Sequence, residues 1–204
     1  MNKFIKAFCL TALLSISAFA QNSGGDEYNK NEFFVGYSNQ QIDQGDNRTF
    51  NGFEGSYVRN VHRYFGIKAD VSGAYRNEEF VGTVSTAPGA TITFSNKSKS
   101  SVYNFLGGVQ VKDNASEARL KPFGHALAGV AVNRVKFENS SSSNTFIQNS
   151  TFTDTGFAAA LGGGLDIKVN DKIDFRVIQV DYNPIYSESR FSNNFRFGIG
   201  IVFK

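Results

Sequence analysis

The sequence predicts an all-β protein, an eight-stranded antiparallel up-and-down transmembrane β-barrel. Three observations lead to this fold class. Apolar residues recur at every second position, the connections between these segments alternate between long and short, and large aromatic residues lie on the face opposite small residues. Hydrophobic residues make up 41% of the 204-residue chain and charged residues 19%, a composition that excludes a disordered chain.

The N-terminus is predicted to be a cleavable export signal. Lys3 and Lys6 precede an apolar run over residues 7–20, which ends in the cleavage motif Ala18-Phe19-Ala20. This run is shorter than the ~20 residues that a membrane-spanning helix needs, and no basic stop-transfer segment follows it. We expect a signal peptide over residues 1–20, a flexible lead-in over 21–31 and a single β-barrel domain over 32–204.

Composition excludes several kinds of site in the mature chain. The single cysteine, Cys9, lies in the signal segment, so no disulfide, cysteine zinc site or cysteine nucleophile is expected. His62 and His125 are too few for a multi-histidine metal site, and we expect no cofactor. Loss of Lys3 and Lys6 lowers the formal net charge from +3 by two units to +1, which argues against nucleic-acid binding.

Alternation with a period of two residues marks the strands. Over residues 157–169 one parity is apolar and the other is small or charged, and no segment of the mature chain has helical periodicity. In the segment 172–183, Arg176 and Asp181 fall on opposite parities, which a β-bulge between them would reconcile. The eight expected strands lie at about residues 32–39, 50–59, 67–76, 101–112, 122–135, 157–169, 172–183 and 195–204.

The connections between these strands alternate in length. The short ones cover residues 60–64, 113–121 and 170–171. The long, polar ones cover residues 40–49, 77–99, 138–154 and 184–193. Successive hairpins end on opposite sides of a sheet, so short turns gather on one side and long loops on the other. Outer-membrane barrels have this arrangement, with short turns in the periplasm and long loops outside.

The chemistry of the two faces indicates which one contacts lipid. The face opposite the apolar one carries small residues, such as Ala158, Ala160, Gly162 and Gly164, which suit the crowded lumen of a small barrel. Large aromatic residues on the apolar face lie near strand ends, as in the aromatic girdles at the two bilayer interfaces. We therefore expect the apolar face to contact the lipids of the outer membrane.

The lumen parity also carries a balanced set of charges. We expect these side chains to pair inside the barrel and to plug it, because unpaired ions in a confined space are costly. The expected lumen network consists of the acids Glu54, Asp70, Asp166 and Asp174 and the bases Lys68, Lys168, Arg176 and Arg196.

Three stretches of the chain carry a family resemblance. They are Phe34-Val35-Gly36-Tyr37-Ser38, residues 51–56 followed by 65–73, and the final strand. Through them, residues 31–204 resemble the eight-stranded outer-membrane β-barrels of the OmpA-like, porin-family type. The final strand is similar to the terminal assembly signal of that family, which implies insertion by a barrel-assembly machinery; Lys204 departs from it, since the family usually ends on an aromatic residue. The residues that match this signal are Phe195, Phe197, Ile199, Ile201 and Phe203.

The function that we expect is a structural or surface-interaction role of a monomeric barrel, exerted through extracellular loops whose ligand the sequence does not identify. A narrow channel for small solutes is the alternative, and a lipid-modifying barrel enzyme is the third hypothesis. An enzyme of that kind needs a histidine near the outer rim, whereas His62 and His125 are expected at the periplasmic end. We expect no catalytic residues, and residues 43–47 and 140–143 are interpreted as solvated loops.

Overall fold

The computed structural model describes residues 28–43, 47–87, 90–141, 149–187 and 189–204. The expected signal peptide over residues 1–20 and most of the lead-in over 21–31 lie outside these described residues. No helix in the described part of the chain is long and apolar enough to cross a membrane.

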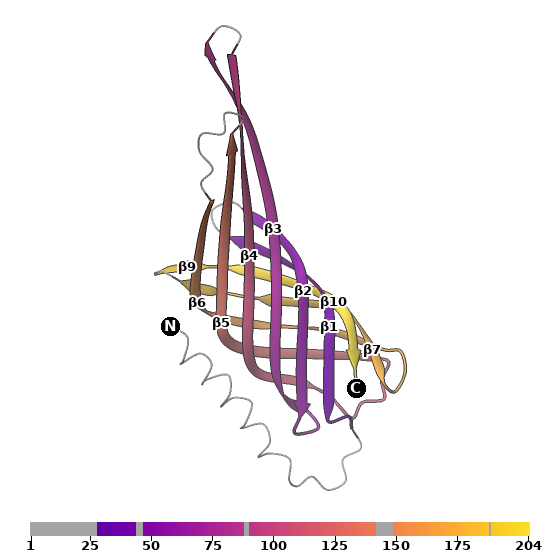
Figure 1. Cartoon of the computed structure of the whole chain (residues 1–204). Coiled ribbons are helices and arrows are strands. Elements are labelled where there is room, and N and C mark those ends of the chain that lie inside the picture. Colours follow the sequence, from indigo (N-terminus) through magenta and orange to yellow (C-terminus); the bar gives the residue numbers. More distant parts are fainter. Residues whose placement is uncertain (1–27, 44–46, 88–89, 142–148, 188) are drawn as a thin grey trace.

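The described chain is built from antiparallel strands (Figure 1). The longer strands are β1 (Asn31–Asp43), β2 (Asn47–Asn60), β3 (Phe65–Ala87), β4 (Ala90–Lys112), β5 (Leu120–Ser141), β6 (Asn149–Lys168), β7 (Ile173–Tyr182) and β10 (Asn194–Phe203). Two short strands, β8 (Ile185–Ser187) and β9 (Arg190–Ser192), form a small hairpin beside β6.

The eight longer strands form a closed ring. Neighbours follow the order β5-β4-β3-β2-β1-β10-β7-β6, and pairing of β5 with β6 closes the sheet. Closure leaves no open sheet edge within the ring, which is the condition for a β-structure to cross a bilayer, where lipid offers backbone groups no hydrogen bonds. This confirms the predicted eight-stranded antiparallel barrel.

The expected bulge in the seventh strand is present. Leu165 of β6 lies opposite Ile178 of β7, but the next residue, Asp166, lies opposite Arg176, so the register slips at residue 177. The slip reverses the parity of the strand. It thereby brings Arg176 and Asp181 to the same inner face, where both are buried.

All four long connections contain more strand than the sequence predicted. The segment 77–99, expected as a loop, is a β-hairpin in which Asn77 pairs with Lys99 and the ladder continues to Ala87 and Ala90. The segment 138–154 likewise contains the end of β5 and the start of β6. Both faces of these extensions carry polar residues, so they lack the contrast between faces on which the strand prediction depends.

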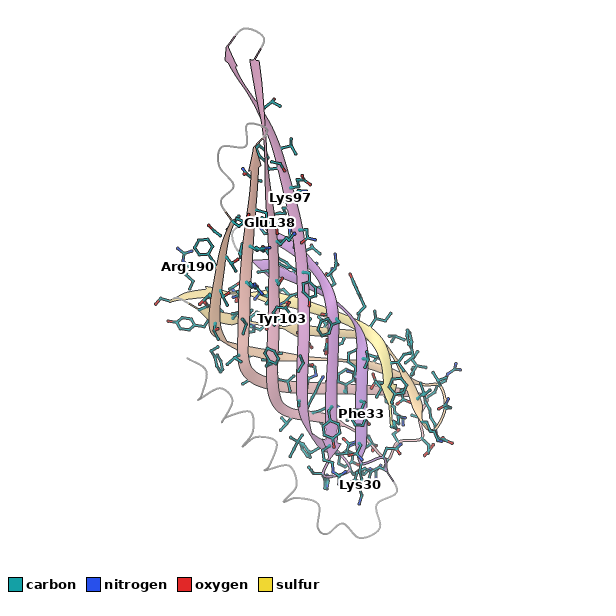
Figure 2. The ribbon with its side chains drawn as sticks, viewed as in Figure 1. Lys30, Phe33, Lys97, Tyr103, Glu138 and Arg190 are labelled. Atoms are coloured by element: carbon teal, nitrogen blue, oxygen red, sulfur yellow. The ribbon has the colours of Figure 1, made fainter. Side chains whose placement is uncertain are left out.

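The outer face of the ring is apolar. Leu161 has 65% of its surface exposed, and its neighbours on the same face are similarly exposed apolar residues. Aromatic residues lie toward both ends of this band: Phe33 contacts Tyr57 at 4.9 Å between ring centroids at one end, and Tyr75 meets Tyr103 edge-on at 5.7 Å at the other. Figure 2 shows Phe33 near the lower end of the barrel and Tyr103 further up. An apolar exterior around a polar interior is the arrangement of a membrane barrel.

Candidate functional site

Arg196 of β10 lies at the centre of a charge network inside the barrel. Its Nη1 donates hydrogen bonds to Asp70 Oδ1 at 2.8 Å and to Ser72 Oγ at 3.0 Å. Its Nε and Nη2 donate to Asp181 Oδ2 at 2.9 and 2.6 Å, and Nε lies 3.7 Å from Glu54 Oε2. One fully buried cation thus links β2, β3 and β7 to β10.

Arg176 of β7 organises a second part of the network. Its guanidinium lies between the rings of Phe34 and Phe123, 4.4 and 3.9 Å from their centroids. Nε donates to Asp166 Oδ1 at 2.8 Å, Nη2 to Asp166 Oδ2 at 3.2 Å, and Nη1 to Gln179 Oε1 at 2.8 Å. Stacking and a two-point contact with a carboxylate fix an arginine in one geometry.

The two arginine clusters are joined by an amide. Gln179 accepts from Arg176, and its Nε2 lies 2.7 Å from Glu54 Oε1 and 2.8 Å from Asp181 Oδ2, which also accepts from Arg196. The side-chain contacts therefore continue without a break between the clusters. Small residues make this crowding possible: a Cβ atom added at Gly162 would overlap the carboxylate of Asp181.

His125 lies near the start of β5, as expected, but its side chain is buried in the lumen. Its Nε2 is 2.9 Å from Asp181 Oδ1, and its Nδ1 is 3.3 Å from Lys68 Nζ. Lys68 in turn lies 3.8 Å from Asp70 Oδ2. His62, by contrast, does lie in the β2–β3 turn, where its Nδ1 accepts from the backbone N–H of Tyr64 at 3.3 Å.

Seven of the eight charged residues predicted for the lumen are buried inside the barrel. These are Glu54, Lys68, Asp70, Asp166, Asp174, Arg176 and Arg196. Lys168 is the exception: it is the last residue of β6, and its amino group contacts Glu117 Oε2 at 2.8 Å and Asp171 Oδ1 at 3.0 Å on the periplasmic rim. Because the strand ends there, the side chain reaches the rim instead of the lumen.

Sequence reasoning missed several members of the network. Lys112 binds Glu32 Oε2 at 2.6 Å and lies 3.4 Å from Asp166 Oδ2, and all three residues are buried. The alternation pattern could have identified Lys112, since it lies on the same inward-facing positions of β4 as Asn104 and Gln110. Asp181 could have been placed only by locating the bulge.

Toward the extracellular mouth the lumen is filled by an apolar layer that the sequence analysis did not predict. Its members are buried apolar residues from seven of the strands. They are Ile42, Phe50, Ala74, Val102, Leu106, Leu127, Ala131, Ala158, Ala160 and Ile185. The barrel interior therefore has two layers, one charged and one apolar, in keeping with the small lumen of eight-stranded barrels.

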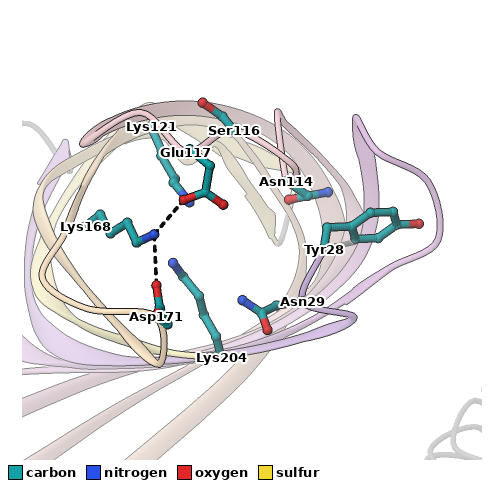
Figure 3. Close-up of a pocket in the computed structure, with 9 residues that line it drawn as sticks. All are labelled: Tyr28, Asn29, Asn114, Ser116, Glu117, Lys121, Lys168, Asp171 and Lys204. Atoms are coloured by element: carbon teal, nitrogen blue, oxygen red, sulfur yellow. Dashed lines mark hydrogen bonds and ion pairs between the residues drawn. The ribbon is translucent and has the colours of Figure 1, made fainter. Parts of the chain in front are cut away.

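The periplasmic rim contains a polar cavity of about 450 Å³ (Figure 3). The amino groups of Lys121, Lys168 and Lys204 point into it, and Lys168 bridges Glu117 and Asp171. These two carboxylates raise the pKa of Lys168 through their hydrogen bonds with it. The amino group of Lys204 also donates a hydrogen bond to Asp174 Oδ1 at 2.6 Å. Lys204, which departs from the terminal assembly signal, therefore has a structural partner in the barrel.

The five residues that resemble a terminal assembly signal share one face of β10. Their side chains point away from the lumen and keep between 36% and 46% of their surface exposed. They are Phe195, Phe197, Ile199, Ile201 and Phe203. Arg196, between the first two, points inward.

An extracellular arm extends beyond the ring (Figure 1). We define the arm as residues 76–87 of β3, 90–100 of β4 and 134–141 of β5, which pair with one another. Pairing of β3 with β2 stops at Tyr75, opposite Asn51. Among the described residues, the β2-side edge of residues 76–87 therefore has no strand partner, and unpaired edges are the usual sites for strand addition.

The outer face of the arm carries four basic residues, Lys97, Lys99, Arg134 and Lys136, and two acids, Glu79 and Glu138. Lys97 lies 3.3 Å from Glu79, while Lys99 and Lys136 contact Glu138 at 3.0 and 2.8 Å. Hydrogen bonds from Lys136 and Lys99 lower the pKa of Glu138 to about 2. Figure 2 shows Lys97 and Glu138 on the arm, above Tyr103.

No group of three or more His, Cys, Asp or Glu residues that could hold a metal ion occurs in the described part of the chain. Residues 44–46 and 142–143, within the segments interpreted as solvated loops, lie outside the described residues.

No protein-family model matches this chain, and no curated protein matches it. Solved structures do. The attachment invasion locus protein Ail of Yersinia pestis, in complex with the heparin analogue sucrose octasulfate, is 17% identical with a TM-score of 0.57, over 85% of this chain and 97% of that one. Neisserial surface protein A is 12% identical with a TM-score of 0.48, over 88% and 99%. The N-terminal β-barrel domain of Pseudomonas aeruginosa OprF is 11% identical with a TM-score of 0.42, over 87% and 100%. The likeness to Ail establishes a shared fold.

Proposed function

We propose that this chain is a monomeric outer-membrane β-barrel protein that acts in surface interaction through its extracellular arm. The observation that carries the proposal is the combination of a filled lumen with an arm that extends beyond it. Arg196, Arg176 and the apolar layer occupy the interior, while residues 76–87 present an unpaired strand edge outside the ring. The surface that is accessible to a binding partner therefore lies outside the ring.

The chemistry of the arm favours an anionic partner. On its outer face, Lys97, Lys99, Arg134 and Lys136 outnumber Glu79 and Glu138 by four to two. Lysine and arginine side chains on an exposed strand can exchange their neighbouring carboxylates for sulfate groups at little cost, because exposed ion pairs are weak. The complex of Ail with a sulfated sugar supports the same class of partner for this fold.

The two alternatives from the sequence are less compatible with the geometry. A channel needs a continuous water path, whereas the charged and apolar layers fill this lumen. A lipid-modifying enzyme needs a reachable histidine near the outer rim, whereas His125 is buried against Asp181 and Lys68 and His62 lies in the short β2–β3 turn. We therefore propose no catalytic role.

The outer surface of the ring indicates which membrane components the barrel contacts. The exposed apolar band between the aromatic rows suits the lipids of the outer membrane. The outward residues of β10, from Phe195 to Phe203, suit recognition by a barrel-assembly machinery during insertion.

The proposed function can be tested by removing the arm and keeping the barrel. Asn77 and Lys99 are register partners, so residues 78–98 can be replaced by an Asn-Gly turn that joins β3 to β4. Proteoliposomes with the parent protein should be retained on immobilised heparin at low salt and released at high salt. Vesicles with the shortened arm, or with Lys97→Gln and Lys99→Gln together, should elute like empty vesicles.

The control is Lys172→Gln, an exposed lysine in the periplasmic turn, which should leave retention unchanged. Equal retention of the parent and the shortened protein would contradict a role of the arm. Folding of each variant is checked by its resistance to protease in the same vesicles.

A further inference from the structure

The extracellular mouth of the barrel contains a second cavity, of about 390 Å³, on the inner side of β2–β5. Phe50, Val102, Val135 and Phe137 supply its apolar lining, and Arg48 and Glu78 lie at its β2–β3 side. The volume falls within the range of small-molecule sites, which combine apolar walls with a few polar groups.

The floor of this cavity is closed. Phe50 and Val102 each keep only 4% of their surface exposed and belong to the apolar layer that fills the upper lumen. Beneath that layer lies the charge network around Arg196. In the described part of the chain, the cavity is therefore a blind cup that is closed toward the periplasmic side, so a molecule bound in it does not pass through.

An aromatic pair lies beyond the upper aromatic row of the barrel. Phe137 packs edge-on against Phe152, with ring centroids 6.1 Å apart, and 63% of the surface of Phe152 is exposed. Phe137 lies opposite Ser98, five residues along β4 from Tyr103 of the upper aromatic row, or about 16 Å at the usual rise per residue. Lipid contact does not account for apolar exposure at this height, and clustered exposed apolar residues mark binding surfaces.

Arg48 provides a charge that is only loosely paired in the cup. The carboxylate of Glu78 is held by Arg76, whose Nε and Nη2 lie 2.9 and 2.6 Å from Oε1. Arg48 Nη1 is 3.9 Å from Glu78 Oε2, which is beyond hydrogen-bond distance. Within the described residues, the ion pair of Arg48 is thus long, and its guanidinium is placed to bind a carboxylate at two points.

We propose that this cup binds a small organic anion, an aromatic or branched aliphatic carboxylate. Its apolar body lies against Phe50, Val135 and Phe137, and its carboxylate contacts Arg48. The site goes beyond the proposed function, because it lies on the inner side of the wall and shares no residue with the basic outer face of the arm.

The probe that tests this site is 3-phenylpropionate, measured by ligand-observed NMR with the refolded protein in lipid nanodiscs. Empty nanodiscs give the signal from partition into lipid. The parent protein should bind the probe saturably, while 3-phenylpropionamide, which lacks the charge, and acetate, which lacks the apolar body, should bind more weakly. Binding at the level of empty nanodiscs would overturn the proposal.

Two variants separate the parts of the site. Arg48→Gln should weaken binding of the acid about tenfold, as expected for a lost hydrogen bond to a charged group, and leave the amide unchanged. Phe137→Ala should weaken both. Arg63→Gln, the same charge change in the periplasmic β2–β3 turn, is the control and should have no effect. If Arg48→Gln or Phe137→Ala behaves like Arg63→Gln, the assignment is wrong, whatever the result on heparin.

Discussion

Arg196 and Asp70 meet inside the barrel although β1 and β2 lie between their strands in the sheet. Arg196 Nη1 donates to Asp70 Oδ1 at 2.8 Å, and neither side chain is exposed to solvent. A contact between strands that are not neighbours must cross the lumen. It therefore ties the sheet together from within, and it occupies the space through which ions would pass.

Replacement of Arg196 by methionine should destabilise the refolded barrel. Asp70, Asp181 and Glu54 would keep their burial and lose their shared cation, and removal of one partner of a buried ion pair costs about 3–5 kcal/mol. The measurement is urea unfolding in lipid vesicles. Arg63→Met, which breaks an exposed pair with Asp113 at 3.0 Å, should cost less than about 1 kcal/mol. Equal effects of the two variants would contradict the network.

The outward orientation of Leu161 can be tested on one strand. Arginine at this site would face the hydrocarbon core, at a cost of about 2–4 kcal/mol for a mid-bilayer position on a lipid-facing strand. Thr151→Arg, on the same face of β6 but beyond the ring, should be nearly neutral. Both free energies of unfolding are measured in vesicles. A Leu161→Arg variant as stable as the parent would indicate that this face does not contact lipid.

Lys204 should stabilise the periplasmic end of the lumen through Asp174. The pair is 2.6 Å long, and the side chains are 4% and 0% exposed. Lys204→Met leaves a buried carboxylate without its cation and should cost about 3–5 kcal/mol. Adding Asp174→Asn should recover a large part of that loss, because the uncompensated charge is gone. Lys172→Met serves as the control. No recovery in the double variant would show that the two residues act independently.

The arm should respond to acid through Glu138. Lys136 and Lys99 lower its pKa to about 2, from an ordinary value of 4.5. Because the folded-state pKa is depressed, the contribution of these contacts is complete above pH 4.5 and is lost as the pH falls toward 2. An NMR titration of the Glu138 carboxyl carbon should give a midpoint below 4.5 in the parent. The midpoint should move back toward 4.5 when Lys99 and Lys136 are both replaced by alanine; a parent midpoint near 4.5 would contradict the geometry.

Sequence patterns predicted the ring and most of the charged lumen for a simple reason. Inside the membrane the two faces of each strand meet opposite environments, so parity alone assigns Glu54 and Asp70 to the interior and Leu161 to lipid. The bulge near residue 177 could be inferred because Arg176 and Asp181 would otherwise face opposite sides. The specific ion pairs in the lumen could not be predicted, since they depend on the register between strands, which the alternation pattern does not determine.

Two features could not be predicted from the sequence, because the two faces of the strands do not differ in polarity there. In the upper lumen, Val102 and Leu106 are apolar on the inner face, just as Tyr103 and Phe105 are on the outer face, so the apolar layer has no signature of its own. In the arm, both faces meet water and residues 77–99 look like a polar loop. Its strands are fixed by pairing with each other and with β5.

The most direct test of the filled lumen is the conductance of the refolded protein in a planar lipid bilayer. The network around Arg196 and the apolar layer around Val102 occupy the described interior. We expect no steady conductance level at neutral pH, either for the parent protein or for the protein with the shortened arm. A reproducible open level of defined size in the parent protein would contradict it and would favour the channel function.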